Sequence, residues 1–188
     1  MATPGGLRER KKEATRRALH DAAMRLTAEH GLDDVTVDAI ADAADVSRRT
    51  FSNYFGGKEE ALLYGAERWM RSLLDAFTSR PADEPSWAAL RAALGTLPEP
   101  CGEPQWAAQA RLARKHPSLR ARLLAHYVDF ERALATLIAE REDLPDGSVR
   151  PRVLAGAFMT ALRIAALDDR PLPRSTDEAL TEMARRFR

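Results

Sequence analysis

A short segment in the first third of the chain, residues 48–53, concentrates side chains that donate hydrogen bonds. Arg48, Arg49, Ser52 and Asn53 occur together there. Guanidinium, hydroxyl and amide groups are the types that hydrogen-bond base edges and phosphates in the major groove of DNA. At helical spacing the aromatic residues of the same region fall on a different face, which they would turn toward a core: Phe51, Tyr54 and Phe55.

The surrounding residues, 36–62, predict two short helices joined by a tight turn, which would position these donors. Thr36 is the expected N-cap of the first helix, and Ser47 is the expected N-cap of the second. Asp45 and Val46 form the turn, because aspartate tolerates a left-handed backbone. The first helix would bury apolar residues spaced as on one helical face: Val37, Ile40, Ala41 and Ala44. This is the pattern of a helix-turn-helix.

The order V-S-R-R-T-F-S-N-Y-F-G-G-K-E-E-A-L at residues 46–62 closely resembles the tetracycline-repressor (TetR) family of bacterial transcription regulators. It is similar to the family's turn, recognition helix and fourth-helix start. The likeness extends upstream through a helix expected at residues 13–30 and the break at Gly31 and Leu32. Two positions depart from the family pattern: Asp45 stands where glycine is usual, and Ser52 stands where an aromatic residue is frequent. The second departure makes the base-reading surface more polar.

The resemblance implies roles for individual residues. Arg48 and Arg49 match positions that read base edges. Four other residues match positions that commonly contact phosphates: Thr36, Thr50, Tyr54 and Lys58. The whole expected DNA-binding set is Thr36, Ser47, Arg48, Arg49, Thr50, Ser52, Asn53, Tyr54 and Lys58.

Composition is that of an ordinary globular protein. The chain has 188 residues, of which 45% are apolar and 30% charged, and its formal net charge is +1. So small a charge argues against a general nucleic-acid coat protein. Residues 7–17 nevertheless hold six basic and two acidic side chains, so a basic arm or first helical turn is available to phosphates. The acidic residues at positions 33, 34, 38 and 42 are expected on another face.

Several function classes are not supported by any motif. The chain has no G-x-S-x-G, G-x-G-x-x-G or P-loop motif, so an enzyme is not expected. The four histidines lack metal-ligand spacing, and neither a metal nor a cofactor is predicted. The single Cys101 excludes an intramolecular disulfide and is interpreted as an incidental thiol rather than a redox sensor. No apolar run approaches the roughly 20 residues that cross a bilayer, and the start lacks a signal peptide, so a cytoplasmic protein without membrane contact is expected.

Apolar periodicity predicts an all-α fold with about nine helices. Residues 1–57 would form a three-helix DNA-binding domain, and residues 58–188 a helical domain for ligand binding and dimerisation. Beyond the helix-turn-helix, helices are expected at residues 58–79, 86–94, 105–115, 118–141 and 149–167, with Ser118 as an N-cap. A capping box at residues 175–178 would start the last helix, which carries Leu180, Met183, Ala184 and Phe187.

Large apolar side chains of the second domain could line one internal cavity or form an ordinary packed core. The resemblance favours the cavity, because TetR-like regulators hold a small-molecule inducer in this domain. Residues 116–141 are more narrowly similar to a subgroup with an acyl-CoA-like ligand-binding domain, whose charged head group would meet cations at residues 111–116. The expected pocket residues are Trp69, Leu73, Phe77, Trp106, Tyr127, Phe130, Phe158 and Leu162.

The resemblance also implies that the last two helices pair with their copies in a second subunit, although an intrachain core helix would show the same apolar pattern. Phe158 and Leu162 are the expected contact positions. The interpretation is a homodimeric repressor that binds a palindromic operator and is released by a small hydrophobic effector, with an acyl-CoA as one candidate. The alternative is a DNA-binding module whose second domain serves only dimerisation or partner docking and binds no ligand.

Overall fold

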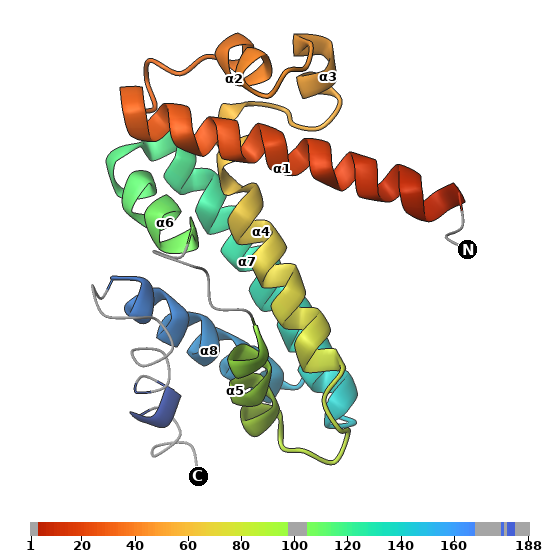
Figure 1. The fold of residues 1–188 in the computed structure, drawn as a ribbon. Helices are drawn as coiled ribbons and strands as arrows, with labels where there is room; N and C mark the ends of the chain where they lie inside the picture. The colour runs from red at the N-terminus through yellow and green to blue at the C-terminus, as the bar shows by residue number, and fades with distance from the viewer. Residues whose placement is uncertain (1–3, 98–104, 168–177, 179, 183–188) are drawn as a thin grey trace. The chain divides into compact units, whose positions relative to one another are not determined.

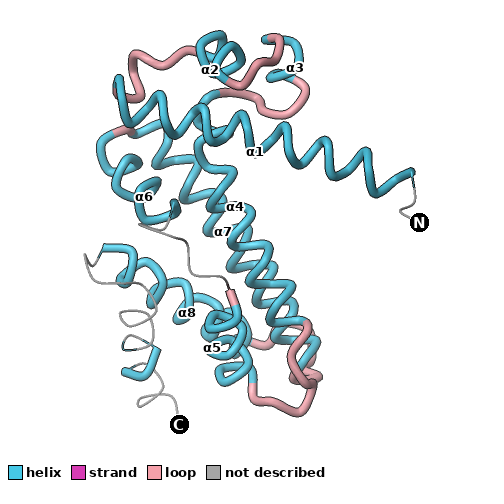
Figure 2. Tube along the Cα trace, in the orientation of Figure 1, coloured by secondary structure: helices cyan, strands magenta, loops and turns pink. Residues whose placement is uncertain are grey.

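The computed structural model describes residues 4–97, 105–167, 178 and 180–182. These residues form helices joined by loops, and no strand occurs among them (Figures 1 and 2). The all-helical prediction is therefore confirmed. The helices are α1 (Pro4–His30), α2 (Val37–Ala43), α3 (Arg48–Ser52), α4 (Lys58–Thr78), α5 (Ser86–Thr96), α6 (Gln105–Lys115), α7 (Pro117–Arg141) and α8 (Val149–Leu167).

The chain divides into two compact units, Met1–Gly65 and Ala66–Arg188. The division falls inside α4, whereas the sequence places the boundary at the start of that helix. The first turns of α4 belong to the first unit because Leu62 and Tyr64 are buried there. The ring of Tyr64 packs edge-on against that of Phe55, with centroids 5.6 Å apart.

The first unit is built around buried side chains of α1, α2, α3 and the start of α4. Helix α1 begins at Pro4, earlier than the predicted start at residue 13. Lysine, arginine and glutamate are good helix formers, so the basic segment continues the helix instead of forming a separate arm. The helix ends at His30, and the next residue, Gly31, has a positive φ of 84°, which suits glycine.

His20 and Tyr64 link α1 to the start of α4 by side-chain hydrogen bonds. His20 is buried, and its Nδ1–H donates to the carbonyl of Ala61 at 2.8 Å. The Tyr64 hydroxyl donates to the carboxylate of Glu13 at 2.5 Å. These contacts hold the beginning of α4 within the first unit.

The second unit has one apolar core to which α4, α5, α7 and α8 each contribute. Fully buried members include Leu73, Leu90, Leu134 and Phe158. The prediction that Ser118 caps α7 is wrong: the helix begins at Pro117, which occupies the first turn. Proline suits that place because its ring has the helical φ and the missing N–H has no partner there anyway.

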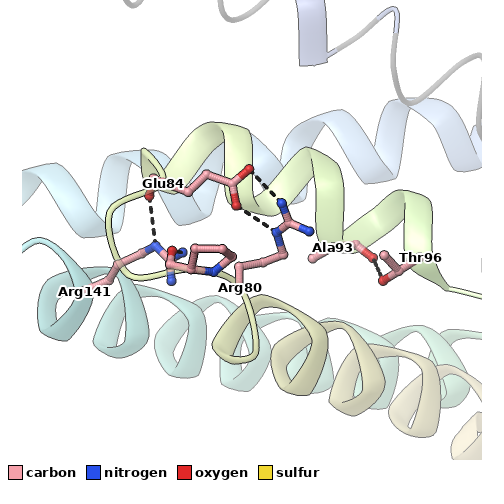
Figure 3. A network of polar contacts seen from close by, with 6 residues as sticks. Arg80, Glu84, Ala93, Thr96 and Arg141 are labelled. Atoms are coloured by element: carbon pink, nitrogen blue, oxygen red, sulfur yellow. Dashed lines mark hydrogen bonds and ion pairs between the residues drawn. The ribbon is translucent and has the colours of Figure 1, made fainter.

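Arg141, at the end of α7, fastens the connection between α4 and α5 (Figure 3). Its guanidinium donates to the carbonyls of Glu84, at 3.1 Å, and Pro81, and lies 5.0 Å from the ring centroid of Phe77. Arg80 in turn donates to both carboxylate oxygens of Glu84, at 2.7 and 3.0 Å. These hydrogen bonds hold the pKa of Glu84 below its usual value.

Candidate functional site

The helix-turn-helix is shaped by the local hydrogen bonds that the sequence predicts. The Thr36 hydroxyl accepts from the amide of Ala39 at 3.1 Å, and the Ser47 hydroxyl accepts from that of Thr50 at 3.0 Å. Between the two caps Asp45 has the expected left-handed backbone, with φ of 54°. Thr36 and Ser47 therefore act as the N-caps of α2 and α3, as predicted.

The short helix α3 separates an apolar face from a polar one. Phe51 is buried together with Phe55, and their ring centroids lie 5.8 Å apart. Thr50 and Tyr54 are half-buried. The four donors identified from the sequence are all exposed: Arg48, Arg49, Ser52 and Asn53. The structure therefore brings these donors together on the solvent side of a rigidly packed element.

Charged groups from two other helices join this surface. Arg48 Nη1 donates to Asp38 Oδ2 of α2 at 2.7 Å. The guanidinium of Arg16, on α1, lies 6.0 Å from the ring centroid of Tyr54. The carboxylate of Asp38 thus reaches the first residue of α3 and partly offsets the positive charge there.

Lys58 donates hydrogen bonds to backbone carbonyls, and the sequence does not indicate these partners. Its ammonium donates to the carbonyl of Leu32 at 2.8 Å and to that of Val35 at 2.9 Å, which accounts for two of its N–H donors. The side chain thus ties the connection between α1 and α2 to the start of α4. Its contact with a phosphate remains a prediction. Carbonyl partners carry no residue signature, so spacing could not have revealed them.

The second unit contains a small, partly open cavity of about 20 Å³ lined by residues of α4, α7 and α8. Three predicted pocket residues line it, namely Trp69, Tyr127 and Leu162, and the rest of the lining is Ala66, Met70, Met159 and Arg163. Ala66, Met70, Met159 and Arg163 were not in the predicted set. Their helical spacing from Trp69 on α4 and from Leu162 on α8 is the sequence signal that could have identified them. Burial raises the pKa of the Tyr127 hydroxyl, so this group stays protonated at neutral pH.

Four other predicted pocket residues do not line this cavity. Leu73, Phe77, Phe130 and Phe158 are buried in the packed core. The side chain of Trp106 lies outside the described residues, as do Cys101, Met183, Ala184, Phe187 and the start of the capping box. The cations at residues 111–116 do not line the cavity, whose charged residue is Arg163 instead.

Helix α8 also carries apolar side chains on its outer side. Val149, Val153 and Ile164 are 61%, 45% and 53% exposed. Phe158 and Leu162, the expected dimer contacts, are instead buried within the protomer core. An open groove of about 660 Å³ adjoins the start of α8, with Val128, Ala135, Leu144 and Pro151 among its lining.

The described part of the chain carries neither a cluster of metal ligands nor a membrane-spanning helix. No group of three or more histidine, cysteine, aspartate or glutamate side chains lies there in a position to hold a metal ion. None of the described helices combines the length and the apolar character that crossing a membrane requires.

Two family descriptions match the chain: "Bacterial regulatory proteins, tetR family" over residues 19–64, and "MftR C-terminal domain" over residues 84–188. The chain is 34% identical to the HTH-type transcriptional regulator TcmR of Streptomyces glaucescens, over 88% of this chain and 78% of that protein.

Solved structures share the fold. FadR of Thermus thermophilus, a TetR-family transcriptional repressor in complex with lauroyl-CoA, is 26% identical with a TM-score of 0.52, over 88% of this chain and 91% of that chain. SmeT of Stenotrophomonas maltophilia, in complex with triclosan, has a TM-score of 0.61 at 20% identity, over 90% of this chain and 89% of that chain.

Proposed function

The chain belongs to the tetR family of bacterial regulatory proteins, and we propose that it is a homodimeric repressor of a palindromic operator, released by a hydrophobic effector. Membership makes it a DNA-binding regulator of transcription rather than an enzyme. The observation that carries the proposal is the exposed donor set of α3 above buried Phe51.

Two copies related by a two-fold axis would present two α3 helices about one duplex turn, or roughly 34 Å, apart, which is why the operator is a palindrome. Arg48 and Arg49 lie in the first turn of α3, and either change to alanine should cost about 1–3 kcal/mol of binding at particular base pairs. Thr36, Thr50 and Tyr54 would hold the phosphates on both sides, whereas the Lys58 ammonium is engaged by the carbonyls of Leu32 and Val35.

The test is to select bound duplexes from a random pool and then compare variants on the selected site. Arg48→Ala combined with Arg49→Ala should lose base preference. Arg132→Ala, an exposed arginine of α7 paired with Asp129, is the matched control and should keep it. A selection without a palindrome, or a double variant with full specificity, contradicts the proposal.

The effector is proposed to be an amphipathic molecule with a long apolar part, such as a fatty acyl-CoA. FadR, which is 26% identical, binds lauroyl-CoA. In this chain the cavity lining is aromatic and aliphatic apart from the Tyr127 hydroxyl and the exposed Arg163, which could meet an anionic head group. A volume of about 20 Å³ suits one water molecule, whereas ligand pockets reach roughly 300–1,000 Å³.

An effector must therefore displace side chains when it enters. Met70 and Met159 can do this most readily, because methionine has three rotatable bonds and adapts to irregular spaces. Ala66, Trp69 and Met70 lie on α4, the helix that continues into the DNA-binding unit. A shift of α4 would change the spacing of the two reading helices. To reverse a 99:1 equilibrium, the effector must favour the released state by about 5.5 kcal/mol.

Operator release titrated with acyl-CoAs of increasing chain length tests the effector proposal. Release should strengthen with chain length, and Arg163→Gln should weaken it more than Arg152→Gln, the same change at another exposed position of α8. If neither the chain length nor the head group alters release, the acyl-CoA assignment fails.

The second candidate is a module whose C-terminal unit docks a partner and binds no effector. The open groove of about 660 Å³ beside α7 and α8 favours this reading, because it is much larger than the cavity of about 20 Å³. Thermal-shift measurements with hydrophobic metabolites, with and without operator DNA, separate the two candidates. Stabilisation by a metabolite that also releases DNA supports the effector.

A further inference from the structure

The first residue of α3 is held by an ion pair with the neighbouring helix. Arg48 Nη1 donates to Asp38 Oδ2 at 2.7 Å, across ten positions of sequence. Asp38 lies in the first turn of α2, and Arg48 begins α3. Both side chains remain open to solvent, with 69% of Arg48 and 56% of Asp38 exposed. Exposed ion pairs contribute little to stability, so the effect of this pair lies in where it places the guanidinium.

The backbone on both sides of the pair is firmly placed. Thr36 caps α2 two residues before Asp38, and Ser47 caps α3 directly before Arg48. Ile40 of α2 and Phe51 of α3 are buried, and the two helices are in contact with each other. The carboxylate and the guanidinium therefore start from fixed points, and only their side-chain torsions are left to be restricted by the ion pair.

The ion pair with Asp38 leaves most of the N–H donors of Arg48 free to read a base. A guanidinium is planar and carries five N–H donors, and one of them is engaged by Asp38. The remaining donors still include pairs with the fork geometry that matches O6 and N7 of guanine, the commonest specific contact in the major groove. A carboxylate that holds one edge of the fork fixes its plane and lowers the entropy lost on binding.

We infer that Asp38 is a positioning residue for Arg48 and sets a preference for guanine at one position of each operator half-site. The inference rests on the proposed operator reading by Arg48. A different role for the same pair would be a latch, in which Asp38 withholds Arg48 from DNA. The exposure of the Arg48 side chain favours positioning, because the fork is accessible while the pair is formed.

Asp38→Asn tests the inference, with Asp42→Asn as the matched control. Asp42 is exposed on the same helix one turn later, so its change removes the same charge from the same helix. The intact protein is titrated, at one salt concentration, with the operator selected by the wild type and with every single base-pair variant of it. Unchanged circular-dichroism melting confirms that each variant folds.

Asp38→Asn should lower the preference for guanine at one position per half-site by at least about fivefold, toward the preference of Arg48→Ala. Asp42→Asn should bind with the wild-type preference. Asp38→Glu, which keeps a carboxylate, should retain part of the discrimination. Replacing that guanine by 7-deazaguanine, which lacks N7, should weaken operator binding by the wild type more than it weakens binding by the Asp38→Asn variant.

Two results overturn the inference. Equal base preferences of Asp38→Asn, Asp42→Asn and the wild type would show that Asp38 does not position Arg48. Tighter binding of Asp38→Asn to all sequences, with the preference unchanged, would show a latch. Full specificity of Arg48→Ala is a separate outcome, because it refutes the reading role of Arg48 itself and not only the contribution of Asp38.

Discussion

Replacement of Lys58 by methionine should lower the free energy of unfolding of the DNA-binding unit. It should change operator affinity only slightly. Methionine keeps most of the side-chain volume and removes the ammonium that donates to Leu32 and Val35 at 2.8 and 2.9 Å. A hydrogen bond to a charged group contributes about 1.5–3 kcal/mol. Two such bonds set an upper range of about 3–6 kcal/mol, and the half-buried position, where water can replace part of the loss, lowers the expected cost to about 2–4 kcal/mol.

Urea unfolding of the full chain, followed by circular dichroism and by the fluorescence of a probe on α1, measures this cost. The control is Lys11→Met, which removes the same charge from an exposed position of α1. It should change the free energy of unfolding by less than about 0.5 kcal/mol. At temperatures where Lys58→Met remains folded, its operator affinity should stay within a few fold of the wild type.

The opposite result would refute this reasoning. If Lys58→Met unfolds like the control while its affinity falls equally on all DNA sequences and the salt slope drops by about one unit, Lys58 acts as a phosphate ligand. The resemblance to the TetR family implies that role, so the experiment decides between the two assignments.

Three further predictions concern the second unit. Arg141→Met should destabilise it by about 1–3 kcal/mol in urea, because the carbonyls of the α4–α5 connection lose their donor, whereas Arg132→Met, an exposed control, should not. Val153→Glu should convert dimers to folded monomers in sedimentation, because its side chain is exposed, while Phe158→Glu should unfold the unit, since it buries an unpaired charge. Burial raises the pKa of Tyr127 above its unfolded value of about 10. The protonated hydroxyl therefore stabilises the folded protein below about pH 10, and this stabilisation is lost as pH rises through the folded pKa. Tyr127→Phe should remove this loss of stability at alkaline pH in melting curves. Monomers of wild type at micromolar concentration, or identical alkaline melting of Tyr127→Phe, would contradict the second and third predictions.

Local features of the first unit follow from sequence because their causes are local. The hydroxyls of Thr36 and Ser47 cap their helices by accepting hydrogen bonds from the amides three residues later in the chain. Asp45 has the left-handed backbone conformation that follows the end of α2. Periodicity likewise indicates that Phe51 faces a core. Such bonds depend on neighbouring residues alone, so residue type and spacing are sufficient to predict them.

The apolar face of α8 was harder to predict, because this helix is rich in small and apolar residues around most of its circumference. The sequence placed Phe158 and Leu162 at a subunit contact as well as in the pocket. The structure turns both inward and leaves Val149, Val153 and Ile164 outside. A helix with little polar contrast does not specify which side the rest of the core will cover.

By itself the sequence determined the helices, the caps of α2 and α3, the helix-turn-helix and the family, since each depends on residues close together along the chain. Only the tertiary structure decided which distant groups meet: Asp38 with Arg48, Lys58 with two carbonyls, Arg141 with the α4–α5 connection, and Arg163 with the cavity. Backbone carbonyls are present in every residue and exposed charges are common, so neither marks its partner in the sequence. Their pairing depends on where packing of the apolar core places the helices that carry them.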